Sequence, residues 1–196
     1  MKIGVLAVQG AFREHEQMLQ NLGAQTVYVK KKEHLEGLDG IVIPGGESTA
    51  IGRLMREYDL IAPIREMAAN GIPMMGTCAG MIVLAKRIAN GDEPHLAVMD
   101  VEVDRNSFGR QRESFETDLD IPAIGEAPFP AVFIRAPHIR DVGPDVTVLA
   151  KYENRVVGVQ QGHLLAFSFH PELTADDRIH RYFLQLVEAR TKQPAG

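Results

Sequence analysis

The stretch Pro73-Met-Met-Gly-Thr-Cys-Ala-Gly80 decides the fold class of this chain. Residues 73–76 form a short apolar strand pattern that runs into Gly76-Thr-Cys-Ala-Gly80, and a helix is expected directly afterwards, over residues 81–88. A nucleophile between two glycines is typical of a strand-to-helix turn, because side chains at the glycine positions would collide with the neighbouring backbone. The pattern predicts that Cys78 lies on a tight turn at the carboxyl end of a buried strand.

The residues before this stretch alternate between strand and helix patterns. Apolar runs predict strands over 2–8, 26–29 and 40–43, and periodic runs predict helices over 12–22, 49–58 and 63–69. Such alternation is typical of a parallel sheet with helices on both faces. We therefore expect an α/β fold with three layers, α/β/α, and a mixed, mainly parallel central sheet.

The second half of the chain is richer in strand patterns. Strands are expected over 98–103, 131–134, 147–152, 155–160 and 164–169, and a final helix over about 175–190. Turn residues separate these runs, so we expect antiparallel strands added to the same sheet. The sequence shows no linker, internal repeat or low-complexity segment. We predict one domain over residues 1–196.

Composition and charge exclude several classes of protein. The 21 Lys and Arg residues against 26 Asp and Glu residues give a net charge of −5, which disfavours nucleic-acid binding. Apolar runs fall far short of the roughly 20 residues of a membrane span, and the N-terminus lacks a signal-peptide pattern. We expect a cytoplasmic protein. The single cysteine, Cys78, excludes an intramolecular disulfide and a thiolate zinc cluster.

A cysteine nucleophile needs a base, and His170 is the strongest choice among seven histidines. It follows the predicted strand over 164–169, so it should lie at the carboxyl edge of the sheet, where open α/β sheets build their sites. Pro171 is expected to keep the chain extended, and Glu172 would then point to the same side as His170, about 6.5 Å away. Cys78, His170 and Glu172 are thus a plausible nucleophile, base and orienting carboxylate.

Pro44-Gly-Gly-Glu-Ser48 follows the predicted strand over 40–43 and precedes a helix that Ser48 could cap. Two interpretations remain open for this segment. It is either a tight turn or a loop whose glycines expose backbone N–H groups to an oxyanion. In the second case the N–H of Ala79, directly after the nucleophile, would be the other donor.

Three arginines are candidates for binding a carboxylate, although surface ion pairs are the commoner role. Arg105 opens the polar segment Arg105-Asn-Ser-Phe-Gly-Arg-Gln111, which also contains Arg110. Arg135 interrupts Phe133-Ile-Arg-Ala-Pro-His138. The remaining histidines form no i, i+4 pair with an acidic partner, and we predict no metal site.

These motifs together resemble the class I glutamine amidotransferases, whose fold is flavodoxin-like. Within that superfamily the chain is similar to the glutaminase subunits of pyridoxal 5'-phosphate synthases. The elbow around Cys78 carries only the broader resemblance, and the narrower one comes from the segments 105–111 and 133–138. One departure is Ile82, where many amidotransferase elbows have glutamine, and it counts against several other branches. The likeness runs through Gly4-Val-Leu-Ala-Val-Gln-Gly10, Pro44-Gly-Gly-Glu-Ser-Thr49, Gly76-Thr-Cys-Ala-Gly80, Arg105-Asn-Ser-Phe-Gly-Arg-Gln111, Phe133-Ile-Arg-Ala-Pro-His138 and Ser168-Phe-His-Pro-Glu172.

The resemblance implies hydrolysis of L-glutamine to L-glutamate and ammonia through a glutamyl thioester, without a cofactor. The ammonia would pass to a (β/α)₈-barrel synthase subunit in a large hetero-oligomer that makes pyridoxal 5'-phosphate. The implied residues are the triad Cys78, His170 and Glu172; the glutamine contacts Gly46, Glu47, Ser48, Arg105, Ile134 and Arg135; the oxyanion donors Gly46 and Ala79; and an interface or switch at Gln9 and Gly10.

Three other interpretations stay open at this point. Another thiol hydrolase could use the same architecture, although such enzymes usually take their histidine from the position after the nucleophile, which here is Ala79. A non-catalytic flavodoxin-like binding module could cradle a phosphate at Gly45-Gly46. A structural partner of a synthase could carry a decayed site, but the triad residues are all present.

Overall fold

The computed structural model describes residues 1–105 and 113–193. In this part of the chain ten strands form one mixed sheet. Nine of them follow the order β2-β1-β3-β4-β12-β11-β9-β6-β5, and β10 pairs with β11. The strands of this sheet are β1 (Lys2–Leu6), β2 (Gln25–Val29), β3 (Gly40–Ile43), β4 (Met74–Thr77), β5 (Ala85–Ile88), β6 (Met99–Asp104), β9 (His138–Val142), β10 (Thr147–Tyr152), β11 (Arg155–Gln161) and β12 (Leu164–Phe167). A separate pair consists of β7 (Ser114–Leu119) and β8 (Phe129–Ile134).

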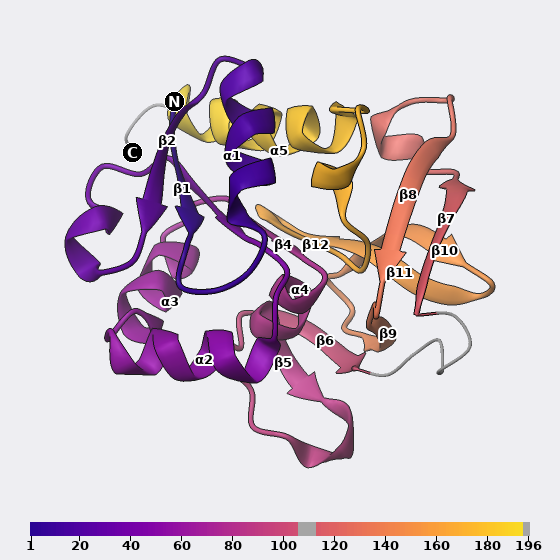
Figure 1. Cartoon of the computed structure of the whole chain (residues 1–196), viewed down its shortest axis with the longest axis horizontal. Helices are drawn as coiled ribbons and strands as arrows, with labels where there is room; N and C mark the ends of the chain where they lie inside the picture. The colour runs from indigo at the N-terminus through magenta and orange to yellow at the C-terminus, as the bar shows by residue number, and fades with distance from the viewer. Residues whose placement is uncertain (106–112, 194–196) are drawn as a thin grey trace.

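Helices cover both faces of this sheet, as Figure 1 shows. One apolar core joins the sheet to α2, α3 and α4, and a second core joins the opposite face to α1, α5 and the β7–β8 pair. The expected three-layer α/β/α architecture is confirmed. The helices are α1 (Phe12–Asn21), α2 (Ser48–Glu57), α3 (Ile61–Ala69), α4 (Ala79–Leu84) and α5 (Arg178–Thr191), with short 3₁₀ turns η1 (Lys32–Leu35), η2 (Ala89–Gly91), η4 (Pro122–Ile124) and η5 (Pro171–Leu173).

The central strands have side chains buried on both faces. In β1, Ile3 and Val5 pack into the core under α1 and α5, whereas Leu6 packs into the core under α2 to α4. A strand that alternates between two cores must be apolar throughout, which explains the continuous apolar runs of the first half. β1, β2, β3, β4 and β12 are parallel to one another, so their carboxyl ends meet at one edge.

Three expectations about strands and helices are wrong. The strand predicted over 131–134 does not join the main sheet: β8 pairs with β7, because Phe129 and Phe133 turn into the aromatic core around Phe169. The strand after 164 is parallel to β4 and antiparallel only to β11. The helix predicted over 81–88 ends at Leu84, and the chain continues as β5. The carbonyl groups of Val83 and Leu84 accept from the backbone N–H groups of Leu96 and Val98 instead of continuing the helix.

The strands β7 and β9 were not predicted from the sequence. The prediction of one domain stays a prediction.

None of the helices in the described ranges combines the length and apolar composition needed to cross a membrane.

Candidate active site

Cys78 lies on the turn between β4 and α4 with φ +53° and ψ −112°, a conformation that L-residues rarely adopt. Its backbone N–H donates to the carbonyl of Phe167 at 2.8 Å, and its carbonyl accepts from the N–H of Met81 at 3.0 Å. The thiol donates to the carbonyl of Ile134 at 3.6 Å. Backbone hydrogen bonds on both sides therefore hold Cys78 in its strained conformation.

The two glycines of the elbow are required by close backbone approaches. A Cβ at Gly76 would lie 2.5 Å from the carbonyl oxygen of Gly80, and a Cβ at Gly80 would overlap the carbonyl oxygen of Ile43. Both contacts are with backbone atoms that cannot rotate away. The expected collision is confirmed, and it lets α4 start directly against β3 and β4.

His170 follows β12, the strand next to β4, and Phe167 is the register partner of Thr77. The backbone N–H of His170 donates to the carbonyl of Val132 at 2.8 Å, which fixes the residue against β8. Its Nδ1 lies 3.0 Å from Oε2 of Glu172. The predicted pair is therefore present, but the route is different: Pro171 begins the 3₁₀ turn η5 instead of keeping the chain extended.

The charge of His170 is set by its two partners. Burial lowers the pKa of His170, but hydrogen bonds with Cys78 and Glu172 and the negative charges of both groups outweigh burial and raise the pKa to about 10. A positively charged imidazole next to a cysteine is an arrangement that favours the reactive form of the thiol.

A pocket of about 290 Å³ opens in front of this pair of side chains. It brings together five of the predicted site residues from four separate segments of the chain. Its mouth includes the exposed apolar side chains of Ile134 and Leu173. The lining residues are Ala11, Gly45, Gly46, Cys78, Ile134, Arg135, His170 and Leu173.

Gly45 and the segment after Gln9 close one side of the pocket. A Cβ at Gly45 would lie 2.7 Å from Cε1 of His170 and 3.2 Å from Cβ of Cys78. The N–H of Ala11 donates to the carbonyl of Gly45 at 3.1 Å, and Oε1 of Gln9 accepts from the N–H of Glu47 at 2.8 Å. The Gln9 side chain packs so closely on Gly46 that a Cβ there would overlap it.

Glu47, and not Ser48, caps α2. Its carboxylate accepts from the N–H groups of Thr49 and Ala50 at 3.1 and 2.7 Å. The cap prediction for Ser48 is wrong because α2 begins one residue earlier than expected, with Ser48 as its buried first residue. Burial raises the pKa of Glu47, but these donors and the charge of Arg105 lower it below its ordinary value.

Arg105 contacts the residues at the start of α2 and does not line the pocket. Its guanidinium lies 3.3 Å from Glu47, 3.2 Å from Oγ1 of Thr49 and 3.1 Å from Asp92. Arg135, by contrast, lines the pocket and is largely exposed, with Glu113 3.9 Å away. The rest of the segment 106–111, including Arg110, lies outside the described residues.

The model of the SNO glutamine amidotransferase family matches residues 5–189. The chain belongs to this family.

Similar proteins agree with this assignment over almost their whole length. A protein of Geobacillus thermodenitrificans (strain NG80-2), named pyridoxal 5'-phosphate synthase subunit PdxT, is 58% identical over 192 residues, 97% of this chain and 98% of that protein. One of the same name from Carboxydothermus hydrogenoformans is 55% identical over 187 residues, 95% of this chain and 98% of that protein. A crystal structure described as a glutamine amidotransferase superposes with a TM-score of 0.90 at 52% identity, covering 95% of this chain and 98% of that one.

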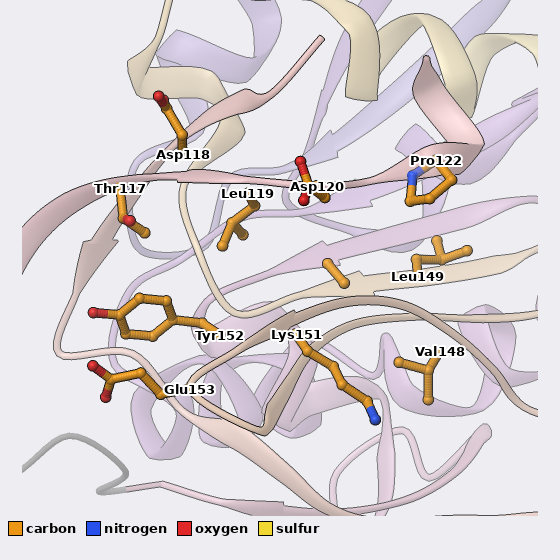
Figure 2. Close-up of a pocket in the computed structure, with 11 residues that line it drawn as sticks. Thr117, Asp118, Leu119, Asp120, Pro122, Val148, Leu149, Lys151, Tyr152 and Glu153 are labelled. Carbon is orange, nitrogen blue, oxygen red and sulfur yellow. The ribbon is translucent and has the colours of Figure 1, made fainter. Parts of the chain in front are cut away.

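Figure 2 shows a larger hollow, of about 610 Å³, between β7 with the residues after it and β10. Asp118, Asp120, Lys151 and Glu153 are among its lining residues, and no residue of the predicted amidotransferase site is. Its lining residues include neither a cysteine nor a histidine, whereas those of the smaller pocket include Cys78 and His170.

Three polar residues that were not predicted as part of the site, His15, Thr77 and His180, are buried near Glu172. His15 follows Phe12 by three residues and precedes Leu19 by four, so it shares the buried face of α1. That position on an apolar stripe was an available signal. In the described ranges, this cluster included, no group of three or more His, Cys, Asp or Glu side chains could hold a metal ion.

Proposed function

We propose that this chain is the glutaminase subunit of a pyridoxal 5'-phosphate synthase, hydrolysing L-glutamine to L-glutamate and ammonia. The observation that carries the proposal is the placement of Cys78 and His170 at the ends of adjacent parallel strands, with Glu172 on the far side of His170. In a member of the SNO glutamine amidotransferase family this arrangement is a nucleophile, a general acid and base, and an orienting carboxylate.

The reaction proceeds in two stages. The Cys78 thiolate attacks the side-chain amide carbon of glutamine, and the tetrahedral intermediate collapses when the carbon–nitrogen bond breaks. His170 gives its proton to the departing nitrogen, which leaves as ammonia. Water then attacks the glutamyl thioester while His170 takes a proton from it, and glutamate leaves as the carbon–sulfur bond breaks.

The backbone N–H groups of Gly46 and Ala79 are the proposed oxyanion donors. As the first residue of α4, Ala79 has no partner for its N–H within the helix. Gly46 lies beneath the Gln9 side chain, so the Gln9–Gly10 segment is placed to control access to this donor. A partner that docks at this edge could move Gln9 and thereby complete the oxyanion site.

The remaining site residues bind the amino-acid end of glutamine. Arg135 at the pocket supplies a donor for the α-carboxylate, and Ile134 packs against the substrate chain. Arg105, Glu47 and Ser48 form the adjoining wall, where Arg105 pairs with Glu47. In this role Arg105 exchanges one of its carboxylate partners for the substrate.

The proposed partner is a (β/α)₈-barrel synthase subunit in a large hetero-oligomer, which receives the ammonia and makes pyridoxal 5'-phosphate. The relatives named as subunits of that synthase support this assignment. The exposed apolar side chains of Ile134 and Leu173 beside the pocket give a docking subunit an apolar surface next to the site. We propose a cytoplasmic location and no cofactor in this chain.

Trapping the covalent intermediate tests the proposal. The full chain is mixed with L-glutamine, with and without the synthase subunit, quenched in acid and analysed by intact mass and peptide mapping. A glutamyl adduct on Cys78, absent from Cys78→Ala, is the expected result. Release of glutamate without an adduct, or from Cys78→Ala, would assign the chemistry to another group.

A further inference from the structure

A chain of buried polar side chains extends from Glu172 into the interior of the protein. Nε2 of His15, on α1, lies 3.6 Å from Oε2 of Glu172 and 3.0 Å from Oγ1 of Thr77. Nδ1 of His15 lies 2.8 Å from Nε2 of His180, on α5. His15, Thr77 and His180 are each 0% exposed, and the catalytic scheme above uses none of them.

Both histidines are neutral. Burial, then the charges of His180 and His170, lower the pKa of His15 well below its ordinary value. Burial lowers the pKa of His180 to about 4, although Asp177 acts in the opposite direction. Each ring therefore carries one proton, and its position determines the direction of the hydrogen bonds.

The charge of Glu172 selects the arrangement of protons. If His15 carried its proton on Nδ1, the lone pair of Nε2 would face the carboxylate of Glu172 at 3.6 Å. With the proton on Nε2, that N–H points toward Thr77 and Glu172, and Nδ1 accepts from the Nε2–H of His180. The second arrangement replaces a repulsion with an attraction in a site without solvent exposure.

Glu172 has few other polar partners among the described residues. Its Oε2 faces both His170 and His15, whereas its Oε1 has no hydrogen-bond partner among the described residues. A carboxylate held through one oxygen is free to rotate about its terminal bond unless a second donor fixes it.

We propose that His15 is a positioning residue that aims an N–H at Glu172 and so keeps this carboxylate oriented toward His170. The proposal rests on the proposed function, in which Glu172 orients the catalytic base. Thr77 and His180 hold the His15 ring in the required tautomer, in the way that outer hydrogen-bond partners fix a functional histidine.

Ionisable groups face this carboxylate from several elements. His170 and, beyond it, Cys78 lie on the substrate side. His15 and His180 lie on the interior side. Glu14 and Asp177 share a hollow with Glu172, and Arg181 pairs with Asp177. Of these groups, only His15 presents a neutral N–H to the same oxygen that His170 uses.

Two polar substitutions separate positioning from packing. In His15→Gln the amide nitrogen reaches the place of Nε2 and can still donate toward Glu172. In His15→Asn the shorter amide reaches only the place of Nδ1 and keeps the contact with His180. Both replace a buried ring with a smaller amide. His163→Asn, at a half-buried histidine that bonds the carbonyl of Ala68, is the matched control for the loss of an imidazole.

The readout is the rate of Cys78 alkylation by iodoacetamide as a function of pH, measured on the full chain. Because Cys78 is the only cysteine, the rate reports one thiolate. We expect the midpoint of the pH profile to rise by about half a unit or more in His15→Asn, since a poorly held Glu172 supports the His170 imidazolium less well. His15→Gln and His163→Asn should keep the midpoint of the unaltered protein.

A His15→Asn midpoint equal to that of the unaltered protein would overturn the proposal, as would equal shifts in His15→Asn and His15→Gln. Circular dichroism and urea unfolding establish that each variant is folded. The alkylation assay needs neither glutamine nor a partner, so it decides the role of His15 even if no glutamine is hydrolysed. If the pH profile of alkylation shifts as expected but no glutamine is hydrolysed, the result counts against the proposed glutaminase function and not against the role of His15.

Discussion

The backbone N–H of Cys78 donates to the carbonyl oxygen of Phe167 at 2.8 Å, which ties the turn after β4 to the end of β12. The two strands are parallel and adjacent. Cys78, directly after β4, and His170, three residues after the end of β12, therefore face the same pocket. The spacing of the nucleophile and the base is thus fixed by sheet register. Loop conformation alone would fix it less firmly.

Substitution of Gly45 should disable the site without unfolding the protein. The added Cβ of Gly45→Ala would press on the ring of His170 and on Cβ of Cys78, and a displacement of about 1 Å at a catalytic group can cost about 100-fold in rate. We expect kcat for glutamine to fall by about that factor while the unfolding midpoint in urea changes little.

Gly40→Ala is the control for crowding alone, since its Cβ would meet core side chains of α5 and β1 at similar distances. It should lower stability and leave kcat per folded molecule nearly unchanged. Equal losses of kcat in the two variants would show that Gly45 has no special relation to His170.

Removal of the cap of α2 should destabilise the protein. Glu47→Ala takes away two charge-assisted hydrogen bonds to the N–H groups of Thr49 and Ala50, so the free energy of unfolding should fall by about 1 kcal/mol. Ser48→Ala is the comparison, because Ser48 is inside the helix and does not cap it. Urea unfolding at pH 7 measures both. A larger loss in Ser48→Ala would restore Ser48 as the cap.

Acidification should weaken the fold through His180. Its native pKa is about 4 and its unfolded value about 6.5, so the unfolded chain binds the proton first. The stability is fully present above pH 6.5 and is lost as pH falls toward 4, by about 2 kcal/mol at pH 5 from this group. Urea unfolding at pH 7 and pH 5 should show this loss.

His180→Leu should reduce the difference between the two pH values, because the buried site that resists protonation is gone. His163→Leu should keep the difference found in the unaltered protein. An unchanged pH dependence in His180→Leu would mean that other groups, such as His15, cause the acid sensitivity.

The sequence predicts the parallel half of the fold well because its strands are continuous apolar runs and its helices are periodic. It predicts the second half less well because β7 and β9 consist mostly of exposed or half-buried residues and form no continuous apolar run. Nothing local to residues 129–134 shows that this strand leaves the main sheet, since the aromatic packing of Phe133 on Phe169 is a tertiary contact.

The reactive residues are predictable for a related reason. Cys78 and His170 each carry a local signal, a glycine elbow and a strand end. The hydrogen bond between His170 and Glu172 was expected from an extended chain but is made through the turn η5. The support behind Glu172 has a weaker local signal, the position of His15 on the buried face of α1. The contact between His15 and His180 has none, because the two residues are 165 positions apart and meet only when α1 and α5 pack on the same face. Arg105 is likewise placed by contacts with α2 that the sequence does not show.

The most direct test of the account is ammonia release from L-glutamine by the purified full chain, with and without a synthase subunit, beside Cys78→Ala. The account predicts ammonia production that appears or rises when the synthase subunit is added and that disappears in Cys78→Ala. Turnover that persists in Cys78→Ala would contradict it. So would the absence of turnover when the two chains are shown to bind each other.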